Sequence, residues 1–328
     1  MRAAVLLAPR KVEIREVPTP QPQRGEVLVK LKVAGICGTD YALFSGNLAT
    51  RFPLIPGHEA TGEIAALGPE VRDLTLGERV TIQPNLFCGK CAMCLKGREN
   101  ICLNKIRLGL DTDGVFAQYI AVPKGNVWHL PEDLPFSAGT LTEPLSVVIH
   151  GIEKCPPSPG ERVLVYGAGI IGLLFVQLAV LAEGWVAAFD IAEPRLALAM
   201  ELGAKKVFGS MADLDKEAAS FSIVYETSGV AEALSHIVRL CSPGGRVVLT
   251  GLPDSEFPLS TTQIVRKELV VQGSMIYKDE FRTAIDLLMQ KKIKTQLLIS
   301  ETYPLERLKE AMEGFKSPKR VKTLIQIP

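Results

Sequence analysis

Three residues near the amino terminus have side chains that could together bind and activate an alcohol. Cys37 lies in the segment AGICGTD, and His58 and Glu59 lie in PGHEATGE. A thiolate, an imidazole and a carboxylate can form an open zinc site, in which one position stays free for substrate. Zinc at such a site lowers the pKa of an alcohol, which can then give up a hydride. The chain has only 4 histidines, which strengthens His58 as a candidate ligand.

A second group of potential metal ligands is a cysteine cluster in a hydrophilic, irregular stretch. Its spacing is C-x2-C-x2-C-x7-C, formed by Cys88, Cys91, Cys94 and Cys102. Four thiolates in one loop can close a tetrahedral zinc site that stabilises the loop and does no chemistry. Bacterial ferredoxins also begin C-x2-C-x2-C, but their fourth cysteine follows after three residues and precedes proline. Leu103 follows the fourth cysteine here, and the longer spacing also favours zinc over an iron–sulfur cluster.

A glycine-rich turn predicts a dinucleotide site. The segment VLVYGAGIIG places Gly167, Gly169 and Gly172 in G-x-G-x-x-G register between an expected strand and an expected helix. The first glycine permits the tight turn, the second lets the backbone approach a pyrophosphate, and the third lets helix and strand pack closely. The helix N-terminus then favours the negative phosphates.

The choice of cofactor is expected to depend on the end of the next strand. Asp190 ends that strand, where a carboxylate can bind the adenosine ribose hydroxyls and repel a 2′-phosphate. This favours NAD over NADP, although Arg195 could stack on adenine or weaken the repulsion. Further cofactor contacts are expected at Ile170, Ile171, Gly251, Leu252, Gly273, Ser274 and Met275.

The elements that position these residues fall into two classes. Up to about residue 140, alternating β-branched segments predict strands at 26–36, 61–68, 78–84 and 116–123. Apolar strands then alternate with helices, which predicts a parallel sheet covered on both faces. The expected strands are 162–167, 185–190, 222–227, 245–251 and 268–274, and the expected helices are 137–154, 170–182, 193–203 and 230–241. Helices at 280–292 and 305–317 and a strand at 321–328 complete the chain. The fold class is therefore α/β.

Composition excludes several classes of protein. The chain has 328 residues, 47% of them hydrophobic, and a net charge of +1. A large core can therefore form, and the charge gives no reason to expect nucleic acid or a membrane surface as partner. The stretch 163–182 lacks charge and is long enough to span a bilayer, but its glycines favour a buried strand followed by a helix. The N-terminus has no signal-peptide core, so we expect a cytoplasmic protein with reduced cysteines.

These motifs resemble the zinc-dependent medium-chain dehydrogenase/reductase family. The CGTD turn, the GHE turn, the four-cysteine lobe, the strand FAQYIAVP and the fingerprint VYGAGIIG occur in the family's order. The resemblance implies a GroES-like catalytic domain at 1–146 and 276–328, and a Rossmann NAD-binding domain at 147–275. It also implies one catalytic and one structural zinc per chain, an active site in the cleft between the domains, and a homodimer or homotetramer.

Within the family, the chain is most similar to the sorbitol-dehydrogenase-like branch. That branch has Glu after the zinc histidine, here Glu59, and a second Glu in an EPLSV segment, here Glu143. The resemblance implies Cys37, His58 and Glu59 as ligands, and places Glu143 at the zinc either directly or through water and substrate. It gives Thr39 the start of the proton relay, although a turn residue bonded to its own backbone would look the same.

Two departures from the family's patterns bear on the substrate. Threonine dehydrogenases have a relay histidine where this chain has Ala42, and sorbitol dehydrogenases have Arg-Tyr where it has Ile276 and Tyr277. Tyr277 and Tyr41 are candidate substrate contacts, although Tyr41 could equally be a packing residue. We expect a small-molecule substrate that is a secondary alcohol of a polyol, cyclitol or sugar alcohol. The alternatives are an NAD(P)-dependent dehydrogenase of simple alcohols or L-threonine, and a non-catalytic NADPH-binding structural member of the same fold.

Overall fold

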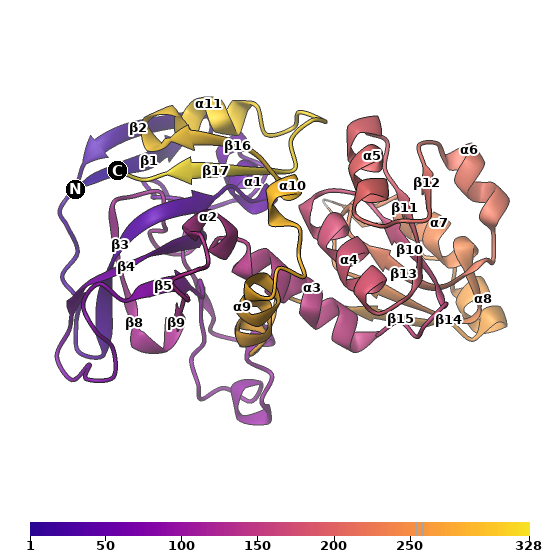
Figure 1. Ribbon diagram of the computed structural model, residues 1–328, viewed down its shortest axis with the longest axis horizontal. Coiled ribbons are helices and arrows are strands. Elements are labelled where there is room, and N and C mark those ends of the chain that lie inside the picture. Colours follow the sequence, from indigo (N-terminus) through magenta and orange to yellow (C-terminus); the bar gives the residue numbers. More distant parts are fainter. Residues whose placement is uncertain (254, 257–258) are drawn as a thin grey trace. The chain divides into compact units, whose positions relative to one another are not determined.

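The computed structural model describes residues 1–253, 255–256 and 259–328, which form two compact units (Figure 1). Unit 1 comprises Met1–Glu143, Phe281–Lys291 and Ile299–Pro328, and unit 2 comprises Pro144–Glu280 and Lys292–Leu298. The chain passes from unit 1 to unit 2 after Glu143 and back after Glu280, near the expected domain boundaries at 146/147 and 275/276. The sequence did not predict that the short segment 292–298 belongs to unit 2. The functional assignment of the two domains stays a prediction.

Unit 1 is built around a seven-stranded sheet that joins both ends of the chain (Figure 1). Its order is β16-β17-β3-β4-β5-β9, and β8 pairs with β3 outside that order. Only the β16–β17 pair is parallel among the pairs described in this sheet. The strands are β3 (Glu26–Gly35), β4 (Glu59–Leu67), β5 (Arg79–Ile82), β8 (Tyr119–Pro123), β9 (Val127–His129), β16 (Ile299–Pro304) and β17 (Lys322–Gln326).

One face of β3 packs against the core of unit 1. Successive side chains of a strand point to opposite faces, so every second residue of β3 points inward. Val27, Val29 and Leu31 are buried in the core, and Lys30 and Lys32 alternate with them. The remaining strands form two antiparallel pairs, β1 (Arg2–Ala8) with β2 (Lys11–Glu16) and β6 (Asn85–Leu86) with β7 (Ile106–Arg107). The helices are α1 (Gly38–Ser45), α2 (Phe136–Gly139), α9 (Phe281–Met289) and α11 (Leu308–Glu313), with 3₁₀ turns at Cys94–Lys96, Glu99–Ile101, Lys124–Asn126 and Leu305–Arg307.

Unit 2 contains a six-stranded sheet in which every pair is parallel, as the alternation of strands and helices predicted. The strands are β10 (Arg162–Tyr166), β11 (Trp185–Phe189), β12 (Lys206–Phe208), β13 (Phe221–Glu226), β14 (Cys241–Leu249) and β15 (Val270–Gly273). The helices are α4 (Ile170–Leu181), α5 (Glu193–Glu201), α6 (Met211–Leu214), α7 (Ala233–Leu240), α8 (Thr261–Lys267) and α10 (Thr295–Leu298), with a 3₁₀ turn at Asp215–Glu217. Helix α3 (Thr142–Lys154) begins in unit 1 and continues into unit 2.

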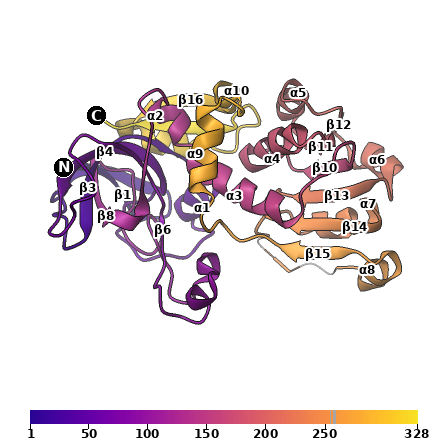
Figure 2. The same cartoon turned by 60° about the horizontal axis from the view of Figure 1, so that its bottom comes forward.

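Helices cover both faces of this sheet (Figure 2). On one face, Leu164 of β10 and Val224 of β13 belong to a core that includes Ile237 of α7. On the other face, Tyr225 of β13 stacks on Phe175 of α4, with ring centroids 4.5 Å apart. The uncharged stretch 163–182 is accounted for by β10 and α4, and among the described residues no helix is both long and apolar enough to cross a membrane.

The strand order of this sheet is β12-β11-β10-β13-β14-β15. From β10, the chain adds β11 and β12 on one side, and then adds β13, β14 and β15 on the other side. In open parallel sheets, ligands bind outside the carboxyl ends of the strands at the point where the order reverses. That point is the end of β10, which Gly167 directly follows. The topology therefore places the glycine-rich turn where a dinucleotide site is expected.

Candidate metal centre and cofactor site

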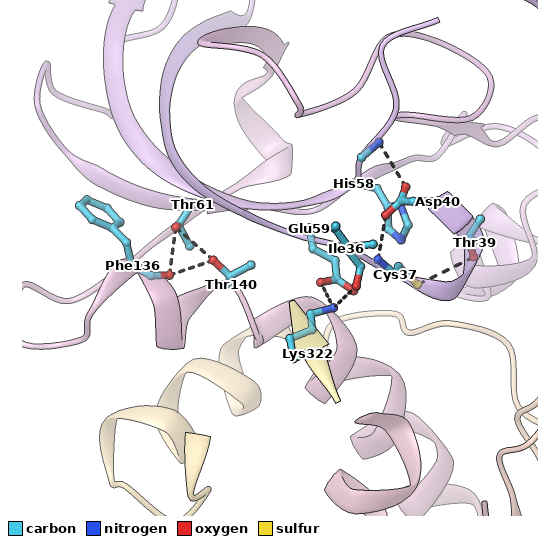
Figure 3. A network of polar contacts seen from close by, with 11 residues as sticks. Ile36, Cys37, Thr39, Asp40, His58, Glu59, Thr61, Phe136, Thr140 and Lys322 are labelled. Atoms are coloured by element: carbon cyan, nitrogen blue, oxygen red, sulfur yellow. Dashed lines mark hydrogen bonds and ion pairs between the residues drawn. The ribbon is translucent and has the colours of Figure 1, made fainter. Parts of the chain in front are cut away.

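The three candidate catalytic ligands come together although they lie in separate segments. Ligand atoms of Cys37, His58 and Glu59 all lie within 4.8 Å of one another. Cys37 is the N-cap of α1, and Glu59 begins β4, where it pairs with Gly35 of β3. Figure 3 shows the three side chains grouped beside β17. The pairing of β3 with β4 therefore assembles the group.

Asp40 holds both the backbone and the imidazole of this group. Its buried carboxylate accepts the Cys37 N–H at 2.9 Å through Oδ2, and the Gly57 N–H at 3.2 Å through Oδ1. The same Oδ1 lies 3.1 Å from Nδ1 of His58. A histidine held by a carboxylate through one nitrogen presents the other nitrogen to a metal. Asp40 therefore has the place of an orienting group behind a metal ligand.

The charges around His58 suit a cation. Burial lowers the pKa of His58, but the Asp40 carboxylate and the Cys37 thiolate raise it more, so the pKa lies well above its ordinary value. The negative charges that favour a proton on the His58 ring also favour a divalent cation beside it. Such a cation would take the place of the proton, because metal ligands are deprotonated. The residues present therefore fit a catalytic zinc ion.

Glu59 forms an ion pair with Lys322 of β17, and both side chains are almost fully buried. The Lys322 ammonium also donates to the Ile36 carbonyl at 3.1 Å. Burial lowers the pKa of Lys322, but the negative charges of Glu59 and Cys37 raise it more, and Glu143 adds to the rise. Lys322 therefore stays charged beneath the candidate ligands, and the influence of Glu143 places that carboxylate within electrostatic reach of the group.

Gly35 leaves the space that this ion pair occupies. A Cβ built on Gly35 would lie 2.2 Å from Oε2 of Glu59 and 2.9 Å from Cε of Lys322. Real side chains essentially never approach so closely, so any other residue would displace the pair. The absence of a side chain at Gly35 is thus part of how the site is built.

The predicted relay and substrate residues have defined places in the structure. The Thr39 hydroxyl lies 3.9 Å from Sγ of Cys37, so it faces the candidate ligand (Figure 3). Tyr41 stacks on Phe315 with centroids 5.1 Å apart. Glu143 lies buried in the first turn of α3, and Tyr277 is fully buried in unit 2. The catalytic and substrate roles of these residues stay predictions.

The four cysteines of the lobe form a compact cluster of sulfur atoms. The Sγ–Sγ distances are 3.9 Å for Cys88–Cys94, 3.5 Å for Cys91–Cys94 and 3.9 Å for Cys91–Cys102. Sulfurs at about 2.3 Å from a tetrahedral zinc lie about 3.8 Å apart. The backbone N–H of Lys90 helps lower the pKa of Cys88 to about 6, which favours the thiolate. The cluster therefore fits a structural zinc ion.

Asn104 supports this cluster from outside the ligand set. Its backbone N–H donates to Sγ of Cys102 at 3.4 Å, and its side-chain Nδ2 donates to Sγ of Cys88 at 3.8 Å. Donors of this kind stabilise thiolates and orient metal ligands. The sequence reasoning did not single out Asn104, although its position two residues after the last cysteine was a usable signal.

Each glycine of the dinucleotide turn has the geometry expected from the motif. Gly167 has φ +99°, a left-handed conformation that side chains rarely adopt. A Cβ on Gly172 would lie 1.8 Å from the Gly167 carbonyl oxygen, so α4 and the turn are in close contact. Gly169 is the N-cap of α4, and a Cβ there would meet nothing within 4 Å. The open side of the turn leaves room for a phosphate at the helix N-terminus.

Asp190 links the glycine-rich turn to the start of α5. Its Oδ2 accepts the Ala168 N–H at 2.7 Å, and its Oδ1 accepts the Ala192 N–H at 2.8 Å. Arg195 lies 3.9 Å from the carboxylate. Each carboxylate oxygen has a further lone pair, so the group can still accept from a ribose hydroxyl. The ribose contact itself stays a prediction.

The other expected cofactor residues lie near the carboxyl ends of the same strands. After β14, a Cβ on Gly251 would lie 2.3 Å from the Gly229 nitrogen, whereas the Leu252 side chain is 76% exposed. Ile191, which follows Asp190, is 88% exposed. Exposed apolar side chains at this end of the sheet suit contact with a nucleoside base. Ile170 and Ile171 open α4, Gly273 ends β15, and Ser274 and Met275 follow it.

Comparison with known families then decides the assignment. The alcohol dehydrogenase GroES-like domain matches residues 23–132, and the zinc-binding dehydrogenase domain matches residues 171–290. The chain belongs to the zinc-binding medium-chain dehydrogenase/reductase family. It is a zinc-containing, nicotinamide-dependent dehydrogenase of alcohols or polyols, which confirms the sequence-based expectations of an enzyme and of its cofactors.

Its relatives within the medium-chain dehydrogenases differ in substrate. Sorbitol dehydrogenase of Bacillus subtilis is 32% identical over 327 residues, covering 95% of this chain and 93% of the relative. L-threonine 3-dehydrogenase of Streptomyces coelicolor is 35% identical over 307 residues, covering 88% of each chain. A zinc-binding dehydrogenase from Sinorhizobium meliloti, solved with NADP bound, superposes with a TM-score of 0.95 at 33% identity, covering 99% of this chain and 98% of that one.

Proposed function

We propose that this dehydrogenase oxidises a secondary alcohol group of a polyol, cyclitol or sugar alcohol, with NAD as the hydride acceptor. The observation that carries the proposal is the Cys37, His58 and Glu59 group, which has a carboxylate where the sorbitol-dehydrogenase-like branch has one. The buried Glu143, whose charge acts on Lys322, supplies the second carboxylate of that pattern. Similarity to a sorbitol dehydrogenase supports the same substrate class.

Different residues of this site have different roles in the proposed reaction. Cys37, His58 and Glu59 would hold the catalytic zinc, which when bound makes a substrate hydroxyl more acidic. Asp40 keeps the His58 ring oriented, and Lys322 balances the charge of Glu59. Thr39, whose hydroxyl lies 3.9 Å from the Cys37 sulfur, would accept the substrate hydroxyl proton while passing its own proton on toward solvent.

The cofactor residues form a separate group in unit 2. Gly167, Gly169 and Gly172 shape the turn that would hold the pyrophosphate, and Asp190 would bind the adenosine ribose. NAD, once bound, supplies the electrophilic ring that takes up the hydride. Arg195 lies 3.9 Å from Asp190, so the preference for NAD over NADP depends on the balance of these two charges.

The decisive test is NADH formation by the zinc-loaded protein across polyols, cyclitols, sugars, L-threonine and simple alcohols. We expect a clear preference for one polyhydroxylated substrate. Cys37→Ser serves as the control that removes a proposed ligand and should abolish turnover of that substrate. Activity confined to simple alcohols or to L-threonine would refute the branch assignment. A protein that holds at most the four-cysteine zinc and oxidises nothing in the panel would favour a non-catalytic member instead.

The role of Glu143 is tested separately. Glu143→Ala should reduce either zinc retention at the catalytic site or turnover, because the variant removes the second carboxylate near the group. Zinc content and kcat are measured on the same preparation. Retention of both full zinc content and full activity would exclude a role for Glu143.

The family resemblance also leads us to propose a homodimer or homotetramer. Strand β15 ends the order of its sheet, and Val270 on it is 52% exposed. Members of the family commonly pair this strand across a two-fold axis. A monomeric mass in light scattering would contradict the proposal.

A further inference from the structure

A third group of metal-ligating side chains lies in unit 2, apart from the two groups described above. Ligand atoms of His150, Glu153 and Glu280 all lie within 4.8 Å of one another. His150 and Glu153 are three residues apart on α3 and so share one face of the helix. Glu280 directly precedes α9. Neither the proposed reaction nor the expected cofactor contacts use these residues.

Burial and charge set this group apart from an ordinary surface cluster. His150 is 6% exposed and Glu280 is 4% exposed, and Nδ1 of His150 lies 2.6 Å from Oε1 of Glu280. Burial raises the pKa of Glu280, but hydrogen bonds from His150 and the Lys278 backbone lower it more, so the carboxylate is ionised inside the protein. A buried charge is costly unless a partner neutralises it.

The second carboxylate increases the need for positive charge. Glu153 is exposed as a whole residue, but partial desolvation of its carboxylate raises its pKa, and the negative charge of Glu280 raises it further. His150 and Lys278 oppose that rise, while Asp279 adds to it. Two carboxylates therefore lie beside one imidazole. His150 and Glu280 are buried, whereas Glu153 is exposed to solvent.

We propose that His150, Glu153 and Glu280 form a third divalent-cation site in each chain, selective for zinc and similar transition metals. One imidazole and two carboxylates are a donor set that suits such ions. The exposed Glu153 gives the cation access, and water completes its coordination. The site is independent of the proposed reaction, because it shares no residue with the candidate catalytic centre.

Occupation replaces one proton and needs a small movement. The short contact between His150 and Glu280 requires a proton between the two atoms, whereas metal ligands are deprotonated. Donors about 2.0–2.1 Å from a tetrahedral zinc lie about 3.3 Å apart, so the 2.6 Å contact must widen by rotation of the Glu280 side chain. The bound cation would then tie α3 to the segment that precedes α9.

The test is a count of bound zinc by equilibrium dialysis and elemental analysis of the full-length protein at increasing free zinc. Glu153→Gln removes the exposed ligand while leaving the buried pair intact, and Glu201→Gln, at an exposed end of α5, is the matched control. We expect Glu153→Gln to bind one equivalent fewer than both the wild type and the control. Equal zinc binding by the two variants would overturn the proposal.

This readout does not depend on the proposed function. The same comparison in a Cys37→Ser background should again show a difference of one equivalent, because that variant lacks a candidate catalytic ligand and keeps the third group. If the difference disappears in that background, the lost ion belongs to the catalytic centre and the third site is excluded. If the difference persists while the wild-type enzyme oxidises no polyol, only the proposed function fails.

Discussion

Lys322 lies directly beneath Glu59, with its ammonium shared between that carboxylate and the Ile36 carbonyl. Lys322 and Ile36 are 286 residues apart in sequence, so this contact joins the last strand of the chain to the turn that carries Cys37. A buried lysine is tolerated only where a negative partner compensates its desolvation. The ion pair therefore makes the C-terminal strand part of the candidate metal centre.

Lys322→Met should strongly destabilise unit 1. The substitution leaves the Glu59 carboxylate buried without its cation, and breaking a buried pair in this way costs about 3–5 kcal/mol. The free energy of unfolding in urea is the measurement, with Lys319→Met on the exposed segment before β17 as the control. A variant as stable as the control would show that the pair contributes little to stability.

Gly35→Ala should weaken the catalytic site without altering any proposed ligand. The new Cβ would lie 2.2 Å from Oε2 of Glu59, so the carboxylate and Lys322 must move. We expect at least a tenfold loss of kcat and reduced zinc retention, measured against Gly125→Ala, where a Cβ would meet nothing within 4 Å. Wild-type kinetics in Gly35→Ala would mean that the pair can shift freely.

Asp40→Asn should lower the zinc affinity of the catalytic site by about 10–100-fold, the range typical for loss of an orienting carboxylate. Asparagine replaces one acceptor oxygen with an N–H donor, so it cannot serve both the Cys37 N–H and the His58 ring. Competition with a chelator should remove one zinc early, while the four-cysteine site keeps its ion. Unchanged competition curves would contradict the orienting role.

Asp190→Ala should raise the Michaelis constant for NAD more than that for NADP. We propose that the carboxylate binds a ribose hydroxyl and repels a 2′-phosphate, and the variant would lose both effects. Steady-state kinetics with each cofactor at saturating substrate provide the measurement. Equal changes for the two cofactors would refute the selecting role and point to a structural one, because Asp190 also holds the Ala168 and Ala192 backbone.

Cys91→Ser should remove one zinc and loosen the lobe around residues 88–104. The sulfur of Cys91 lies 3.5 Å from that of Cys94, and Cys91, Cys94 and Cys102 are the buried members of a small apolar cluster in the lobe. We expect a lower melting temperature and faster proteolysis within the lobe, with the zinc of the catalytic centre retained. Cys155→Ala, at a buried cysteine outside both groups, should keep both ions. Loss of both ions from Cys91→Ser would indicate that the two sites depend on each other.

The sequence by itself determined the features whose parts are close along the chain. The four cysteines and the three glycines have spacings that fix their ligand geometry and turn geometry locally, and the alternation of strands and helices predicted the parallel sheet of unit 2. The sequence predicted the ends of individual helices less accurately. The helix expected at 305–317 is a 3₁₀ turn followed by α11, which ends at Glu313. A Cβ on the next residue, Gly314, would lie 1.8 Å from the Arg320 guanidinium, a contact that the local pattern could not show.

Only the tertiary structure decided which residues support the candidate site. The pairing of β3 with β4 brings Cys37 to His58 and Glu59, and the pairing of β17 with β3 brings Lys322 beneath them. The requirement for glycine at position 35 also appears only when the strands are assembled. Contacts between distant segments depend on strand register, and register is set by the burial of whole faces rather than by any short motif.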